Sequence, residues 1–583
     1  MKIINKIYFL FTFLMCFEIM LTAQQKEVVG YFAGGGMKDY RYTVKNIVAS
    51  GSAEILTVIN YAFSQPRPDS SGRIVPVINQ PELAYQKLCD AEHSVDGIAD
   101  DSTQALRGNF NQLKKLKSLF PKMKILMSIG GWGGCTYFSD AAMTDESREI
   151  FVDSCMSLFI EGNLPIVNGA GGKGAAADIF DGIDIDWEYP VANGPEGMHF
   201  NPKDNDNLSK LFKLFRKRMD SIKPGLLLTA ALPAQEINVN NFSVAEDSKV
   251  LDWFTLMTYD MYGGRDSSTG HHTNLFKAAN EPVVHPGFYS LVNTVKLFHE
   301  KYGVGYDKLL PGVAFYGRGW HGVNPENNGL FQGSEVKTAG FNNYNNLMKL
   351  RSQGFNEHFD KSAMAPWLFN SEKKIFWTFD NAQSVALKSL YVAEHGLRGL
   401  MFWELSGDDS SGTLIHAIST KEMPDVSIKP TNRINKKISI EITDPNDGDY
   451  FIEGSDIKIF TDIPENDSSI IKVEFFVDNK SIGYVANGFY DWVWFNVKEG
   501  KHIVNVVGLD KEGNTIESNS VTVNVNPMDK CSTIWHPGTK YDAGEQVIYN
   551  GNIFICIKSF DISGSTKEPG LETHYWKVLK GIE

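Results

Sequence analysis

Between residues 27 and 404, short apolar runs alternate with longer segments in which apolar residues recur every three or four positions. Eight runs have the length and near-continuous apolar character of strands buried on both faces: 27–32, 56–63, 124–130, 181–188, 226–232, 253–259, 309–317 and 397–404. Helical patterns lie between several of them, at 109–120, 146–160, 207–222 and 287–302. This alternation predicts a (β/α)8 TIM barrel, in which functional residues lie at the C-terminal ends of the strands.

The pattern changes in three later segments. The stretch from about 318 to 396 is too long for a simple connection and carries its own turn and strand signals, which predicts an α+β insertion between barrel strands seven and eight. After a polar linker at 422–436, residues 437–526 alternate with period two between regular turns, as in an Ig-like β-sandwich. Residues 527–583 predict a small all-β module that needs an aromatic cluster or a disulfide for its core.

The first 23 residues have the features of a secretory signal peptide. Lys2 and Lys6 precede an apolar run that is short for a spanning helix and is interrupted near its end by Glu18. The barrel is then expected over residues 24–421. We expect a secreted, extracellular monomer with no membrane association once the leader is cleaved.

Composition narrows the possible partners. The chain has 583 residues, of which 42% are hydrophobic, and a formal net charge of -14 at pH 7. Binding to phosphates needs a basic face, and the sequence contains no run rich in Lys or Arg, so nucleic acid is excluded as a partner. A neutral or basic ligand fits this charge.

Five cysteines remain beyond the leader. An oxidising destination would allow Cys135 to pair with Cys155 and Cys531 with Cys556, which leaves Cys89 unpaired, although spacing does not determine the connectivity. None of the five has metal-ligand spacing with a histidine.

The stretch "FDGIDIDWEYP", residues 180–190, concentrates carboxylates among apolar residues. In a strand, Asp184, Asp186 and Glu188 share one face, while the interleaved isoleucines and tryptophan take the other. The carboxylates therefore line the barrel axis and lead towards its C-terminal end. Like charges crowded in a dry interior cannot all ionise, so at least one pKa is raised, which is typical of a catalytic site.

Two other interpretations of this stretch are weaker. A calcium loop would need a turn with a glycine in mid-loop, whereas the interleaved residues here are apolar and β-branched. An acidic surface strand is incompatible with the flanking Phe180, Ile183 and Ile185. Asp181, at the start of the strand, is expected to be structural.

Several motifs together resemble family 18 glycoside hydrolases, the chitinases. "DGIDIDWE" resembles the family's D-G-x-D-x-D-x-E signature, "LMSIGGW" (126–132) its S-x-G-G strand and "LMTYDMYG" (256–263) its M-x-Y-D strand. "GVAFYGRGW" (312–320) and "GLMFWELSGD" (399–408) resemble its seventh and eighth strands. The motifs occur in the family's order and cover roughly residues 26–421.

The resemblance implies a hydrolysis in which the substrate's own 2-acetamido oxygen attacks C1 of the sugar. In that mechanism, Glu188 is the general acid and then the base for water, Asp186 holds the acetamido N–H, and Asp184 shares a proton with Asp186. Tyr259 contacts the acetamido group. No cofactor and no metal are implied.

The resemblance also implies a set of substrate-binding residues. Trp403 would form the aromatic floor of the central sugar subsite, and Asp260 would contact the acetamido group. Phe63 could equally be ordinary barrel core. The complete set expected to contact substrate is Asp260, Trp403, Tyr31, Phe63, Trp132, Met257 and Arg318.

The C-terminal segment resembles the small chitin-binding modules of families 5 and 12, through "IWHPGTKYDAGEQVIYNG" and "YWKVL". Trp535, Tyr541 and Trp576 match the recurring aromatic residues on which a flat sugar face can stack. The sequence departs from the module in having Lys567 before Glu568 and Pro569, where a tryptophan is frequent. Some or all of these rings could therefore belong to the core.

Taken together, these features predict a secreted chitinase that acts on chitin and chito-oligosaccharides with retention at the cleaved β-1,4 bond. Two alternatives stay open. A chitin-binding lectin without activity shares the fold but typically lacks the acid, which is present here as Glu188. An endo-acting N-glycan hydrolase uses the same chemistry.

Overall fold

The computed structural model describes most of the chain. It covers residues 26–39, 41–191, 194–263, 266–282, 290–335, 340–419, 439–463, 470–486, 489–511, 513–527, 533–536, 539–549, 552–559, 569, 573 and 575–580. The expected signal peptide at 1–23, the linker at 422–436 and Cys531 lie outside the described residues.

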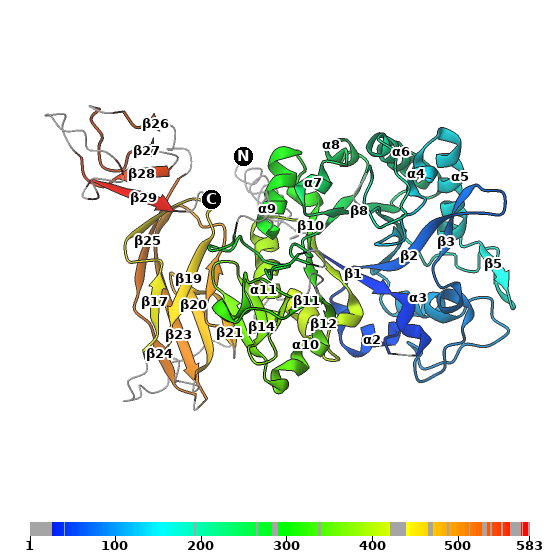
Figure 1. The fold of residues 1–583 in the computed structure, drawn as a ribbon, viewed down its shortest axis with the longest axis horizontal. Coiled ribbons are helices and arrows are strands. Elements are labelled where there is room, and N and C mark those ends of the chain that lie inside the picture. Colours follow the sequence, from blue (N-terminus) through cyan, green and yellow to red (C-terminus); the bar gives the residue numbers. More distant parts are fainter. Residues whose placement is uncertain are drawn as a thin grey trace, which may run out of the picture.

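Eight parallel strands close into a barrel at one end of the molecule (Figure 1). The barrel closes because β1 pairs in parallel with both β2 and β16. The sheet order is β1, β16, β10, β9, β8, β7, β4, β2, with β3 added outside β2. The TIM barrel predicted from the sequence is confirmed. Its strands are β1 Glu27–Ala33, β2 Val58–Pro68, β4 Lys124–Gly130, β7 Gly182–Asp186, β8 Leu227–Pro233, β9 Trp253–Met257, β10 Leu309–Ala314 and β16 Gly399–Trp403.

Amphipathic helices cover the outside of the barrel. In α6 (Asp204–Ile222), Leu208, Leu211, Phe212, Phe215 and Met219 recur at helical spacing and are all buried. The other principal helices, α3 Gly108–Leu119, α5 Asp145–Cys155, α9 Leu291–Lys296 and α11 Ala382–Glu394, also present apolar residues to the main core.

The seventh predicted strand is divided in the structure. The chain leaves the barrel after β10, and β11 (Tyr316–His321) belongs to a separate antiparallel sheet. The N–H of Phe315, between the two strands, donates to Trp403 O at 2.9 Å, which anchors the crossover to β16. The separate sheet is the insertion, in the order β12 Gly340–Asn343, β11, β15 Ile375–Phe379, β14 Ala365–Asn370 and β13 Asn356–Asp360.

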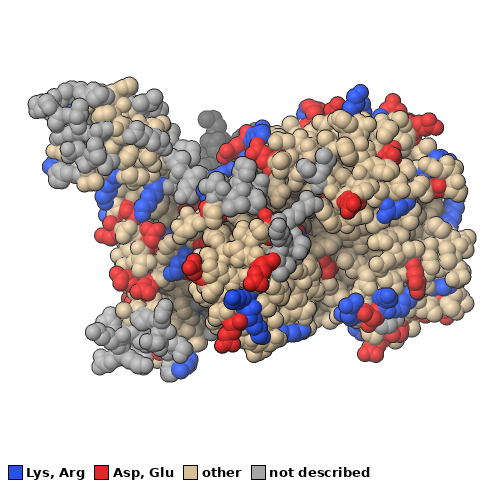
Figure 2. Space-filling view, viewed as in Figure 1, with Lys and Arg blue, Asp and Glu red and all other residues tan. Residues whose placement is uncertain are grey.

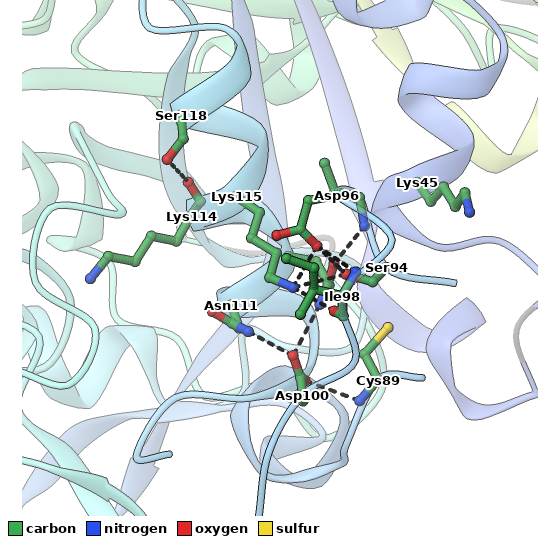
Figure 3. Close-up of polar contacts among 12 residues, drawn as sticks. Lys45, Cys89, Ser94, Asp96, Ile98, Asp100, Asn111, Lys114, Lys115 and Ser118 are labelled. Atoms are coloured by element: carbon green, nitrogen blue, oxygen red, sulfur yellow. Dashed lines mark hydrogen bonds and ion pairs between the residues drawn. The ribbon is translucent and has the colours of Figure 1, made fainter. Parts of the chain in front are cut away.

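A polar network fastens the loop that precedes α3 to that helix (Figure 3). Lys115 Nζ donates to Asp96 Oδ1 (2.7 Å), Ser94 Oγ (2.9 Å) and the carbonyl of Ile98 (2.7 Å). Nearby, Asp100 accepts from Cys89 N at 3.0 Å. These contacts give a loop with little apolar content a defined position beside the barrel.

The segment after residue 439 forms two β-sheets. A three-stranded sheet contains β17 Glu441–Asp444, β19 Ile457–Asp462 and β22 Trp492–Trp494. The larger sheet contains β21 Lys480–Ala486, β20 Ile470–Val477, β23 Gly500–Asp510, β25 Val521–Asn526 and β18 Asp449–Ile452, with β24 Thr515–Glu517 beside β23. The expected β-sandwich is therefore present.

The larger sheet continues into the C-terminal module without a break. Strand β29 (Trp576–Lys580) pairs in parallel with β18, and β28 Asn552–Cys556, β27 Gln546–Tyr549 and β26 Thr533–Ile534 follow it. Lys580 Nζ lies 2.6 Å from Asp449 Oδ2, and Lys577 Nζ donates to the carbonyl of Gly448. The module is thus joined to the sandwich through backbone pairing and charged contacts.

The sandwich also packs directly against the barrel and its insertion. The Phe359 ring of β13 stacks on Phe489 with centroids 5.5 Å apart. Gln383 in α11 donates to the carbonyl of Phe489 at 2.8 Å, and His395 Nε2 lies 3.3 Å from Asp456 Oδ1. These contacts make the sandwich a support for the insertion.

Four described cysteines, Cys89, Cys135, Cys155 and Cys556, are buried free thiols. The pairing of Cys135 with Cys155 is therefore wrong. Cys135 Sγ instead lies 3.2 Å from the carbonyl of Asp186 and accepts from the N–H of Glu188 at 3.3 Å, so it contacts the end of β7. Within the described part of the chain, no helix is long and apolar enough to cross a bilayer.

Phe489→Ala should weaken the contact between sandwich and insertion. Loss of a half-buried ring that stacks on Phe359 should lower the free energy of unfolding by about 1–3 kcal/mol. Urea unfolding followed by tryptophan fluorescence measures this, with Ile503→Ala as the control because Ile503 is 51% exposed. Equal midpoints for the two variants would contradict a supporting role for this contact.

Candidate active site

Strand β7 carries Asp184 and Asp186 towards the C-terminal end of the barrel, and Glu188 follows two residues beyond its end. All five of its residues are buried. Ile183, Ile185 and Trp187 join the core between barrel and helices, where Trp187 stacks on Phe138 with ring centroids 5.1 Å apart. The alternation of a strand therefore turns the carboxylates of Asp184 and Asp186 to the barrel interior, as predicted.

Asp184 is held by three hydroxyl groups from three other strands. Tyr31 and Ser128 each donate to Asp184 Oδ2 at 2.8 Å, and Thr229 donates to Oδ1 at 2.5 Å. Burial raises the pKa of Asp184, and these three hydrogen bonds oppose that rise because they stabilise the charged form. Of Asp184, Asp186 and Glu188, Asp184 therefore receives the most hydrogen bonds that stabilise an anion.

The carboxyl group of Asp186 is less well satisfied by hydrogen bonds than that of Asp184. Its Oδ1 is buried without a hydrogen-bond partner, and burial together with the charges of Glu188 and Asp184 raises its pKa well above the usual range. Asp186 therefore retains a proton more readily than an exposed aspartate.

Glu188, 9% exposed, lies beyond the end of the strand. Burial and the nearby charge of Asp260 raise its pKa to about 7, against hydrogen bonds from Tyr189 and from the backbone of Trp132. A carboxyl group that still holds its proton near neutral pH is suited to general acid catalysis.

Gly130, at the end of β4, allows this strand end to pack closely. Its φ is +120°, and a Cβ at this position would lie 2.0 Å from the carbonyl oxygen of Asp186. Gly131 donates its N–H to the carbonyl of Asp186 at 2.8 Å. The glycines of the "SIGG" segment thus allow the backbone approach that places Asp186, while Ser128 contacts Asp184 directly.

Aromatic rings form one side of the site. Trp403, at the end of β16, stacks on Phe63 with centroids 5.6 Å apart and planes 15° apart, and Tyr31 lies 5.5 Å from Trp403. Met257 packs partly buried against the same cluster. Tyr31 is only 2% exposed, so its principal contact is the hydroxyl bond to Asp184 rather than a face open to substrate.

Tyr259 and Asp260 follow β9, and Arg318 comes from β11 of the insertion. Arg318 donates hydrogen bonds from Nε and from one terminal nitrogen to the two oxygens of Asp260, each at 2.6 Å. The contacts with His272 and Arg318 outweigh the effect of burial and hold the pKa of this carboxyl well below its usual range. The hydroxyl of Tyr259 donates to Met401 Sδ at 3.6 Å. Trp132, 58% exposed, projects beside Tyr189 at 6.5 Å between ring centroids.

Comparison with known proteins assigns this barrel to a family. The model of "Glycosyl hydrolases family 18" matches residues 27–408. The chain belongs to glycosyl hydrolases family 18. A bacterial Ig domain model matches residues 439–506.

Named relatives of this family 18 chain are chitinases. It is 32% identical to "Chitinase A1" of Niallia circulans over 66% of this chain and 57% of that protein, and 34% identical to "Chitinase C" of Streptomyces lividans over 66% and 58%. The chain thus spans less than two thirds of the length of these relatives. The structure of the catalytic domain of psychrophilic chitinase B from Arthrobacter TAD20 superposes with a TM-score of 0.63 at 33% identity, covering 68% of this chain and 95% of that one.

The contacts of several residues of the family 18 barrel were not predicted from the sequence. Thr229 and Ser128 hold Asp184, and Tyr189 bonds to Glu188. Phe341, 51% exposed, stacks on Tyr316 with centroids 4.7 Å apart and lies under the Arg318 guanidinium. The exposed aromatic ring on an insertion strand is a further candidate sugar contact, and no motif around it indicates this position.

The C-terminal module places its predicted sugar-binding rings differently. Tyr541 and Trp576 are 3% and 2% exposed and form the module's core with Val547, Phe554 and Cys556. Their faces are therefore not open to a sugar, which corrects the expected role. Trp535 is half-buried and packs on Tyr549, so part of its ring remains accessible.

Charge is distributed without a dominant sign on the face shown in Figure 2, where Lys and Arg are interspersed with Asp and Glu. Within the described residues, no group of three or more His, Cys, Asp or Glu is arranged to hold a metal ion. The candidate site is a group of carboxylates bordered by aromatic rings.

Glu188→Gln should stabilise the folded protein at high pH. The folded-state pKa of about 7 exceeds the ordinary value of 4.5, so Glu188 supports folding below about pH 4.5 and loses that contribution as pH rises towards 7. The amide removes this loss, so the variant should exceed wild type by roughly 1–3 kcal/mol at pH 8 and match it near pH 4.5.

Urea unfolding at the two pH values measures the difference. Glu372→Gln is the control, because Glu372 is exposed in the turn between β14 and β15. A Glu188→Gln variant that unfolds as readily as wild type at pH 8 would show that the site does not raise this pKa.

Proposed function

We propose that the protein is a secreted chitinase that hydrolyses β-1,4 bonds between N-acetylglucosamine units with retention. The observation that carries the proposal is the group of three buried carboxylates at the C-terminal end of the barrel, Asp184 and Asp186 on β7 and Glu188 just beyond it, with burial raising the pKa of Glu188 to about 7. The family and the chitinases among its relatives support the substrate.

In this proposal the acid and the nucleophile come from different molecules. Glu188 gives its proton to the leaving glycosidic oxygen, and the acetamido oxygen of the substrate attacks C1 from the other side of the ring. Asp186 holds the acetamido N–H, which orients the oxygen and stabilises the positive charge that develops. Glu188 then removes a proton from the water that opens the cyclic intermediate.

The surrounding residues have supporting roles in the same proposal. Asp184, held by three hydroxyls, keeps Asp186 protonated until substrate binds, and Tyr259 orients the acetamido oxygen. Trp403 and Phe63 stack on the central sugar, and Trp132, Arg318 and Phe341 contact flanking sugars. No metal or organic cofactor takes part.

Two alternatives make different predictions. A lectin without activity would bind chito-oligosaccharide and leave it intact, and it has no need of a carboxyl group with a raised pKa. An N-glycan hydrolase would release glycans from glycoproteins. The chitinase relatives favour chitin as the substrate.

The test is cleavage of soluble N-acetylglucosamine hexamer by wild type and by Glu188→Gln, with products resolved by length and anomer. Wild type should give β-anomeric products, and the variant should lose roughly 10²–10⁴-fold in kcat because it cannot donate the proton. Glu372→Gln should retain wild-type activity.

No cleavage by wild type would contradict the proposal. Binding without cleavage would then favour the lectin, and release of glycans from a glycoprotein would favour the N-glycan hydrolase. Products with the α-anomer would contradict retention alone.

A further inference from the structure

Two adjacent buried histidines follow β9 and face different partners. His271 is 2% exposed, and its Nε2 lies 3.1 Å from Asp360 Oδ2 in the insertion. His272 is fully buried, and its Nδ1 lies 3.7 Å from Asp260 Oδ1 at the candidate site. Neither was among the residues singled out in the sequence, because no spacing motif links them to the carboxylates.

His272 holds the backbone where the chain turns at Asp260. The N–H of Asp260 donates to His272 Nδ1 at 3.4 Å, and the N–H of Met261 donates to the His272 carbonyl at 3.1 Å. Asp260 has a φ of +56°, in the left-handed region that a residue with a side chain adopts only when its surroundings hold it there. The two contacts from one histidine supply that restraint.

The contact to Nδ1 bears on the protonation state of the ring. Because the N–H of Asp260 donates to Nδ1, this geometry favours a neutral ring with its proton on Nε2, which is buried without a hydrogen-bond partner. Burial lowers the pKa of His272, and Arg318 adds to this effect, while Asp260 and Asp380 oppose it. Tyr316 covers another side of the ring, with centroids 5.2 Å apart.

The position of Asp260 matters for the acid. Its carboxylate lies in the fork of Arg318, and its negative charge adds to burial in raising the pKa of Glu188 to about 7. A shift of this carboxylate would therefore change the pH at which Glu188 loses its proton. His272 is therefore linked to Glu188 through Asp260.

We propose that His272 is a positioning residue, whose neutral imidazole holds Asp260 in the Arg318 fork so that its charge faces Glu188. The kinetic consequences of this inference rest on the proposed hydrolase function. The protonation state of the imidazole does not depend on that function. His272 acts through Asp260 and does not contact the substrate.

The test compares Leu and Asn substitutions at both histidines in the full chain. An Asn side chain can place its oxygen where Nδ1 lies and accept from Asp260 N–H, whereas Leu cannot. His272→Leu should lower kcat/KM for the hexamer roughly 10–100-fold, mainly through kcat. The alkaline pH at which kcat/KM falls by half should be lower than in wild type by about 0.5–1 pH unit. His272→Asn should stay within about 3-fold of wild type with an unshifted fall.

The His271 variants are the matched controls. His271→Leu removes the partner of Asp360 and should lower the melting temperature, yet leave the pH of the fall in kcat/KM unchanged. If His272→Leu shows only a lower melting temperature and the same pH profile as His271→Leu, the residue is merely structural and the inference is overturned.

A measurement independent of activity separates this inference from the proposed function. In protein labelled with ¹⁵N-histidine, the His272 signals, assigned by their loss in His272→Asn, should show a neutral ring with unprotonated Nδ1 at pH 7 and still at pH 6. A proton on Nδ1 at pH 7 would overturn the inference even if the hexamer is cleaved. The expected spectrum together with an inactive wild type would overturn only the proposed function.

Discussion

The burial of three carboxylates, two on one face of β7 and Glu188 just beyond its end, is the constraint on which the rest of the site depends. A strand points alternate side chains in one direction, so Asp184 and Asp186 both face the barrel interior, where the charge of Glu188 also acts on Asp186. Such crowding is tolerable only if some groups keep their protons and others receive hydrogen bonds. Three hydroxyls satisfy Asp184, while Asp186 and Glu188 respond with raised pKa values.

The partners that make this arrangement possible come from distant parts of the chain. Tyr31, Ser128 and Thr229 lie on β1, β4 and β8, and closure of the barrel brings all three to Asp184. Arg318 comes from the insertion and fixes the position of Asp260. The insertion in turn rests on the sandwich through Phe359 and Gln383, so domains outside the barrel help to support one wall of the site.

Much of the barrel could be predicted because its strands are nearly continuous apolar runs, and the carboxylate face followed from the period of a strand. Side-chain partners in three dimensions could not. The pairing of Arg318 with Asp260 and the hydroxyl bond from Tyr31 to Asp184 each join residues that are far apart in the sequence. Tyr541 and Trp576 illustrate the same limit, since a short sequence cannot distinguish an exposed aromatic ring from one needed for a small core. The free thiol of Cys135 could not be foreseen either, because its contacts with Asp186 and Glu188 arise only when the loop after β4 packs against the end of β7.

The most direct test of the account is the pH dependence of kcat/KM of the wild-type protein on soluble N-acetylglucosamine hexamer. Because Glu188 must hold a proton to act as the acid, the account predicts a single-proton fall centred near pH 7, where burial and Asp260 place its pKa. A fall centred near pH 4.5, or a rate that is constant up to pH 9, would contradict it.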